Sequence, residues 1–202
     1  MLIRDLYQKY QIMPQLATHM LRVAGVGKLI TDSWNDRELA VKSVIACLVH
    51  DLGNLAKFKL GPEYQTEWGP KQEKLWEKWG HDAHVATYGI LKELGMEEYV
   101  EYLLAEAKLY ESEPTPADFE QTSRPALVVL YADLRVAMSG VVSLEERIAD
   151  LAARYSGFRA ESRWGKMLEG YVQTLTSTDV RSITEKSVTP LFDELLRYNI
   201  EV

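Results

Sequence analysis

The chain has 202 residues, which is enough for one substantial globular domain. Apolar residues make up 47% of it and charged residues 26%, proportions typical of a soluble protein with a buried core. The 30 acidic against 23 basic side chains give a net charge of −7, which argues against nucleic acid or an anionic membrane surface as the main partner. A small anionic substrate stays compatible with this charge, because a local cation can override the global sign.

The cysteine content and the hydrophobic runs indicate where the protein resides. A single cysteine, Cys47, excludes an internal disulfide bond, and its apolar surroundings indicate a small buried side chain. No run approaches the ~18 apolar residues of a transmembrane helix. The opening residues, MLIRDLYQKY, lack the basic-then-apolar layout of a signal peptide. We therefore expect a cytoplasmic protein without membrane contact.

Helical periodicity begins early in the chain. Apolar residues recur at steps of three and four over 12–30 and predict a helix there. Asn35 or Asp36 can cap the next helix, with Glu38 three residues after Asn35 in capping-box style. This second helix is predicted to run on until Gly53 ends it.

The middle of the chain alternates between breaking and helical signals. Glycine and proline punctuate residues 55–70 and predict a loop. Helical signals resume over 71–80 and again over 82–94, which Gly95 closes, and a further helix is predicted over 96–111.

The second half also lacks persistent strand-like alternation. Residues 111–125 form a polar, proline-containing connection that is partly helical at best. Ser143 and Glu146 make a capping box, and Pro190 either kinks the last helix or starts a new one. Four helices are predicted here: 125–138, 144–155, 159–177 and 181–198. The fold class is therefore predicted to be all-α, with residues 1–202 in a single domain.

One apolar run, SVIACLV, ends in the adjacent pair His50 and Asp51. Burying a carboxylate costs several kcal/mol unless a cation or strong donors compensate. An imidazole and a carboxylate together suit a divalent transition metal or magnesium. The alternative is a histidine at a helix end that hydrogen-bonds a backbone carbonyl.

Two more polar residues lie on apolar helices. His19 belongs to the helix predicted over 12–30, and the alternative to a metal ligand is a core histidine that is hydrogen-bonded within the protein. Asp133 interrupts ALVVLYADLRVAM, and its alternative partner is Arg135 or a nearby hydroxyl group. Three separate predicted helices each carry a buried side chain of a kind that binds metal ions. This pattern suggests that the three helices hold one cation in the core of a bundle.

These motifs together resemble the HD-domain phosphohydrolases. The resemblance rests on four segments within residues 16–140, which follow one another in the same order as in the family: HMLRVAGVGKLI, ELAVKSVIACLVHDLGN, HVATYGILKELGM and YADLRV. The resemblance implies an all-helical bundle that residues 144–198 complete. It also implies that His19, His50, Asp51 and Asp133 bind a divalent metal ion, which can be Mn, Fe, Co, Ni, Mg or Zn.

The chain departs from the family at Asn54. Many members with phosphodiesterase activity carry lysine at this position, and many nucleotidase-type members carry glutamate, so neither subgroup is assigned. His81 and His84 are three residues apart and share a face if the helix extends back to His81. They are candidates for a second metal site or for phosphate contacts, the alternative being two polar residues at a helix start.

The resemblance also implies a reaction. Four protein ligands leave about two positions of an octahedral ion for a water, which becomes acidic there, and for a phosphoryl oxygen. Asp51 and Asp133 are the catalytic candidates, since either carboxylate can accept the proton of the water. Arg22, Arg135 and Lys57 are the candidate phosphate ligands, with ion pairs as the alternative. Five aromatic residues within 55–80 either form a lid that stacks on a base or pack beneath a loop.

We therefore expect a metal-dependent phosphohydrolase that cleaves a nucleotide or another small phosphate ester. The alternatives are a phosphodiesterase of the same superfamily and a non-catalytic regulatory or scaffold domain that keeps the metal. The expected partner is a small phosphorylated substrate, and the apolar face of the final helices is compatible with a homodimer.

Overall fold

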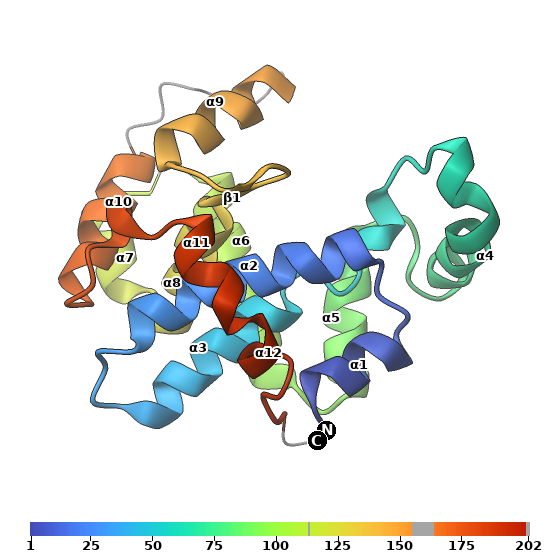
Figure 1. The fold of residues 1–202 in the computed structure, drawn as a ribbon, viewed down its shortest axis with the longest axis horizontal. Helices are drawn as coiled ribbons and strands as arrows, with labels where there is room; N and C mark the ends of the chain where they lie inside the picture. Colours follow the sequence, from blue (N-terminus) through green and yellow to red (C-terminus); the bar gives the residue numbers. More distant parts are fainter. Residues whose placement is uncertain (113, 155–163, 201–202) are drawn as a thin grey trace.

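The computed structural model describes residues 1–112, 114–154 and 164–200, and most of them are helical (Figure 1). The all-α prediction is confirmed. The α-helices are α1 (Ile3–Lys9), α2 (Pro14–Thr31), α3 (Arg37–Val49), α4 (Pro62–Trp79), α5 (Ala83–Glu93), α6 (Glu97–Glu111), α7 (Pro116–Gln121), α8 (Arg124–Asp133), α9 (Leu144–Arg154), α10 (Trp164–Thr174), α11 (Glu185–Val188) and α12 (Phe192–Leu195). The short 3-10 helices are η1 (Asn54–Lys57), η2 (Val180–Ser182) and η3 (Thr189–Leu191).

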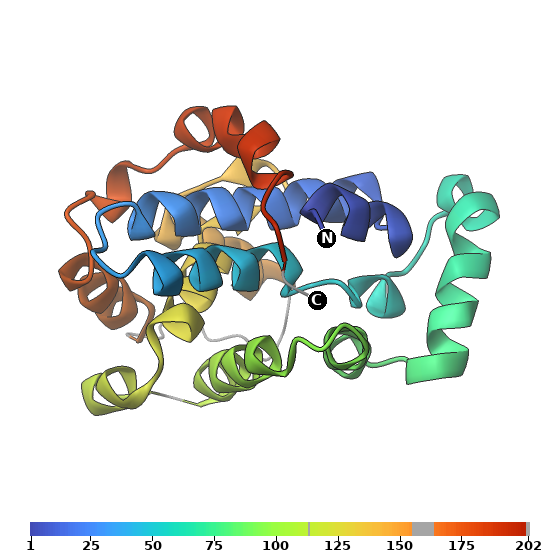
Figure 2. The same ribbon diagram turned by 90° about the horizontal axis from the view of Figure 1, so that it is seen from below.

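Helices α2, α3 and α8 pack against one another at the centre of the fold. Figure 2 shows α2 and α3 running side by side, with α6 and α5 on the far side of α3. The buried faces of α3 and α8 extend almost all the way round each helix, because seven consecutive residues of α3, 43–49, and eight of α8, 125–132, are buried. The segment 37–57 is apolar and long enough to span a membrane, but 72% of its most apolar window is buried inside the fold, as in the core helix of a soluble protein.

The predicted loop over 55–70 is wrong, since most of it belongs to η1 and α4. Pro62 occupies the first turn of α4, where a missing N–H costs nothing, while Pro70 lies within the helix. Tertiary contacts compensate for this second proline. Gln72 donates hydrogen bonds to the carbonyls of Leu55 and Phe58, and the Trp76 indole donates to Ala56. These bonds tie α4 to η1, so local breaking signals are overruled.

The helix predicted over 125–138 ends early. Helix α8 stops at Asp133, and a two-stranded antiparallel hairpin follows, with β1 (Val136–Ala137) and β2 (Gly140–Val141) paired through Val136 with Val141. The Ser143–Glu146 capping box is present, because each residue's side chain accepts from the other's backbone N–H. Helix α9 starts directly after it, as predicted.

The C-terminal helices are shorter than predicted. Residues 155 and 159–163 of the predicted helices lie outside the described residues, and the described part of the third helix is α10. The predicted helix over 181–198 is instead a series of short turns, η2, α11, η3 and α12, with Pro190 in η3. Helices α11 and α12 cross over α2 in Figure 1 and pack against it.

Candidate metal centre

The fold brings four predicted ligands from three helices to one place. His19 projects from α2, His50 and Asp51 follow the last turn of α3, and Asp133 ends α8. The His19 Nε2 atom lies 3.4 Å from Asp51 Oδ2 and 3.1 Å from Asp133 Oδ1. The His50 Nε2 atom lies 3.6 Å and 3.7 Å from the same two oxygens. The ligand atoms of His19, His50 and Asp51 all lie within 4.8 Å of one another, and Asp133 approaches both imidazoles from α8.

The orientation of His50 suits a metal ligand. Its Nδ1 atom lies 2.8 Å from the carbonyl oxygen of Cys47, and because a carbonyl only accepts, Nδ1 must carry the proton of this hydrogen bond. The Nε2 atom is buried and has no hydrogen-bond partner among the residues that the structure describes. A buried nitrogen without a partner is costly. A backbone acceptor on the far side of the ring is the arrangement that fixes metal-binding histidines, so the donor set fits a divalent cation.

Charge pairing dominates the electrostatics of the cluster. Burial alone would lower the pKa of His19, but hydrogen bonds to Asp133 and Asp51 and their charges raise it to about 9. The pKa of His50 is also raised, since the charges of Asp51 and Asp133 outweigh its burial. Burial opposes ionisation of the two carboxyls, yet the two imidazoles lower the pKa of Asp51 to about 2 and that of Asp133 well below its usual range. Without a cation, protons on the histidines therefore supply the positive charge that the carboxylates need.

The metal centre lies in the wall of a cavity of about 1310 Å³. Three of the residues predicted to contact phosphate, Arg22, Lys57 and His84, line this cavity, and so does Asn54. Arg22 reaches the cavity while it forms a two-oxygen ion pair with Glu185 in α11, with Nε–O distances of 2.8 and 3.1 Å. Among the five aromatic residues of 55–80, Phe58 alone lines this cavity. Trp68 packs in the core, the Trp76 indole bonds to Ala56 in η1, and Tyr64 is exposed, so these three do not form a lid over the cavity.

Two predicted residues lie elsewhere. Arg135 is 2% exposed and does not line the cavity, because its guanidinium donates to the backbone carbonyls of Val142, Val180 and Ile183. This placement gives Arg135 a structural role, which corrects the expectation of a phosphate contact. Helix α5 starts at Ala83 behind its Asp82 cap, so His81 lies outside the helix and stacks on Trp76 with ring centroids 4.4 Å apart. The expected shared face with His84 is therefore absent.

Gly53 explains how His84 comes near the centre. A Cβ atom on Gly53 would lie 2.4 Å from the backbone nitrogen of Thr87, so only glycine allows α5 to approach this closely. The Gly53 N–H donates to the Thr87 hydroxyl at 2.9 Å. The turn after His50 and Asp51 thus holds the first turn of α5, which carries His84, beside the cavity.

Sequence reasoning missed Glu106. This α6 residue lines the cavity, and burial together with the charges of Asp133 and Asp51 raises the pKa of its carboxyl to about 8. The signal in the sequence was weak but present: Glu106 lies three residues after Leu103 and three before Leu109, both of which are buried. A carboxylate on a predicted apolar face is the pattern that singled out Asp133, and it applies here as well.

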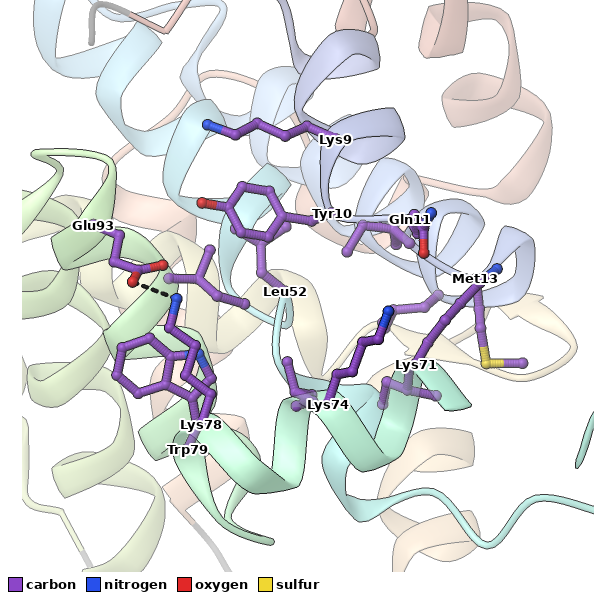
Figure 3. A pocket seen from close by; sticks show the side chains of 15 residues that line it. Lys9, Tyr10, Gln11, Met13, Leu52, Lys71, Lys74, Lys78, Trp79 and Glu93 are labelled. Atoms are coloured by element: carbon purple, nitrogen blue, oxygen red, sulfur yellow. Dashed lines mark ion pairs between the residues drawn. The ribbon is translucent and has the colours of Figure 1, made fainter. Parts of the chain in front are cut away.

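A second cavity, of about 290 Å³, lies between α1 and α4 (Figure 3). Leu52 lies behind it and the lysines Lys9, Lys71, Lys74 and Lys78 surround it; Lys78 forms an ion pair with Glu93. None of the four metal-centre residues lines it. Of these two cavities, the larger one therefore contains the candidate metal centre.

Comparison with known proteins agrees with this geometry. The family model for the HD domain matches residues 16–156, a span that contains all four residues of the centre. No curated protein matches the chain, and no solved structure matches it either. The match covers well over half of the residues and coincides with the helices that carry the cluster, so the chain belongs to the HD domain family.

Proposed function

We propose that this protein is a metal-dependent phosphohydrolase that cleaves a small phosphate ester, a nucleotide among the candidates. One observation carries the proposal: two imidazoles and two carboxylates from three helices converge at a cavity wall, with the buried Nε2 atom of His50 lacking a partner. The cationic side chains of Arg22 and Lys57 line the same cavity, and phosphate needs such donors.

His19, His50, Asp51 and Asp133 would hold the cation. A divalent metal ion there supplies a Lewis acid for the phosphoryl group and makes water a better nucleophile at neutral pH. The depressed pKa values of Asp51 and Asp133 keep both carboxylates ionised at neutral pH, so they can orient water by accepting its hydrogens. Lys57 and Arg22, which line the cavity, would bind phosphate oxygens, and the ion pair with Glu185 would fix the direction of the Arg22 guanidinium.

Glu106 is our candidate for the proton donor to the leaving oxygen. In the metal-free protein its pKa is raised to about 8, mainly by burial, so the carboxyl carries a proton at neutral pH, which is the state that a general acid needs. Asn54, which also lines the cavity, can donate or accept a hydrogen bond but cannot serve as a base. The proton chemistry of this site therefore differs from that of relatives with glutamate or lysine at this position.

The test combines metal analysis with a substrate panel. Purified protein is analysed for bound metal and then assayed with Mn²⁺, Co²⁺, Ni²⁺ or Mg²⁺ against nucleotides, generic monoesters and generic diesters. We expect bound metal and monoester cleavage in the cytoplasmic pH range. Diester cleavage would instead indicate a phosphodiesterase, and bound metal without any turnover would indicate a regulatory or scaffold domain.

A matched pair of variants locates the activity. His50→Ala is expected to lose metal and turnover together, because it removes the buried nitrogen at the centre of the cluster. His81→Ala is the control, since His81 is exposed, stacks on Trp76 and lies outside the cavity. Full activity in His50→Ala would refute the site.

A further inference from the structure

The smaller cavity, between α1 and α4, reaches the core of the protein. Its volume of about 290 Å³ is close to the lower end of the roughly 300–1,000 Å³ that pockets for small ligands have. Part of its lining is a floor of core side chains that are at most 8% exposed: Met13, Leu16, Leu52, Leu55 and Ile90. An apolar group on this floor would leave water and contact the core, which is favourable in proportion to the area that it buries.

Four lysines surround this apolar floor. Lys9 comes from α1, while Lys71, Lys74 and Lys78 follow one another in α4 at steps of three and four residues, so these three share one face of the helix. Glu93 is the one acidic residue in the lining. Four lysines and one glutamate give the lining a net charge of +3, whereas the whole chain carries −7. The positive charge is therefore local to this cavity, and it favours an anion there.

Lys74 and Lys9 are the lysines available to a ligand. Lys78 and Lys71 already have carboxylate partners. Lys74 and Lys9 are exposed, and neither forms an ion pair with any residue that the structure describes. Figure 3 shows the Lys74 side chain extending from α4 toward the wall that Tyr10 forms. Because both ammonium groups face water, an anion can reach them without breaking a contact within the protein.

The smaller cavity is separate from the metal centre. Leu16 is the one residue that lines both cavities, and none of the four residues of the centre lines the smaller one. Its lining also contains no histidine, cysteine, serine or threonine. The side chains of this cavity therefore suit the binding of a ligand rather than a reaction on it.

We propose that this cavity is a second ligand site, which binds a small molecule with one anionic group and an apolar body. The apolar body lies against Leu52 and Ile90 on the floor, and Lys74 and Lys9 bind the anionic group at the exposed edge. Medium-chain and aromatic carboxylates have this chemistry. The inference does not depend on the hydrolase proposal, because no residue of the metal centre contributes to the site.

The test compares probes that differ in charge or in the apolar body. Dissociation constants are determined by calorimetry for octanoate and octanamide, for 2-naphthoate and 2-naphthamide, and for acetate. We expect the anion of at least one pair to bind about tenfold more tightly than its amide, because several weak ion pairs act on the same group. Acetate should bind at least about tenfold more weakly than that anion, since it buries little apolar surface. Added NaCl should reduce the preference for the anion, because salt screens exposed charges.

Lysine variants assign this preference to the smaller cavity. The double variant Lys9→Met/Lys74→Met is expected to lose the preference, while its affinity for the amide changes less than about twofold. Lys92→Met is the matched control, because Lys92 is an exposed lysine next to Glu93 in α5 that lines neither cavity. Lys57→Met controls for binding in the larger cavity, which Lys57 lines. Both control variants should keep the preference.

A cavity-filling variant tests the apolar half of the site. Leu75 lines the cavity and is only partly buried, so a larger side chain there can fill the cavity without disturbing the core. Leu75→Trp should weaken the binding of the preferred anion and of its amide by about tenfold or more. Unchanged binding in this variant would overturn the inference.

The remaining outcomes also decide the matter. The inference fails if the wild-type protein shows no preference for either anion, if the preference survives in the double lysine variant, or if Lys57→Met removes it. Hydrolysis is assayed separately with metal. Turnover without anion preference refutes the second ligand site alone, whereas anion preference without turnover of any ester refutes the hydrolase alone.

Discussion

Raising the pH of the metal-free protein is expected to destabilise it through His19. The pKa of His19 is about 9 in the fold against 6.5 for a free side chain. Between these values the folded state binds more protons than the unfolded state, so the free energy of unfolding falls as pH rises. One pKa unit corresponds to about 1.4 kcal/mol, so the shift of His19 amounts to roughly 3 kcal/mol. This contribution is fully present below pH 6.5 and lost as the pH passes 9.

Glu106 also makes the free energy of unfolding fall as the pH rises, but over a lower pH range than His19. Its pKa rises from 4.5 to about 8 on folding, so its neutral form is favoured and stability falls between these values. Asp51 acts in the opposite sense, because its pKa falls from 3.8 to about 2. Its contribution is present above pH 3.8 and disappears as the pH falls through 2. Because the His19 and Glu106 windows overlap below pH 8, the full His19 contribution is obtained from the difference between the wild-type protein and a variant without His19.

Urea unfolding between pH 6 and 10, with a chelator present, measures how these groups contribute to the free energy of unfolding. The wild-type protein should lose stability with rising pH, and His19→Gln should lose roughly 3 kcal/mol less. Added metal should reverse the trend, because metal binding requires deprotonated imidazoles and therefore strengthens as pH rises. Identical pH slopes in the wild-type protein and in His19→Gln would refute the charge pairing described for the centre.

Four more variants test separate parts of the structure. Glu106→Gln should lower kcat by about 10²-fold and remove the decline of wild-type activity at the basic end of the pH–rate profile; an unchanged profile contradicts the proton-donor role. Lys57→Met should raise KM for phosphate esters, and an unchanged KM would exclude a phosphate contact. Arg135→Met should cost about 3 kcal/mol or more in urea unfolding, because three buried carbonyls lose their donor, and a loss below 1 kcal/mol contradicts this role. Gly25→Ala should lower the free energy of unfolding by about 1–3 kcal/mol, because the new Cβ atom would lie 2.4 Å from Val188 Cγ1. A variant as stable as the wild-type protein would contradict this and show that α11 shifts at little cost.

Local patterns predicted the helices that build the centre. The period of apolar residues placed α2 and α3 close to their observed bounds, because both helices bury broad apolar faces in the core. The same reasoning singled out His19, His50, Asp51 and Asp133 as polar groups at buried positions, and the order of these residues carried the family resemblance that the HD match confirms. Local signals failed over 55–70, where contacts of Gln72 and Trp76 with η1 outweigh the glycine and proline signals.

The sequence by itself therefore determined the fold class and the family, and it predicted the four residues that the fold brings together, because periodicity and residue type indicate which side chains are buried. The tertiary structure alone decided what each buried polar group faces. Arg135 follows α8 and Arg147 lies in α9, yet the first donates to backbone carbonyls from other parts of the chain and the second to Asp150 of its own helix. Periodicity gives the direction of a side chain relative to its own helix, whereas its partner comes from a different part of the chain, and only packing brings the two together.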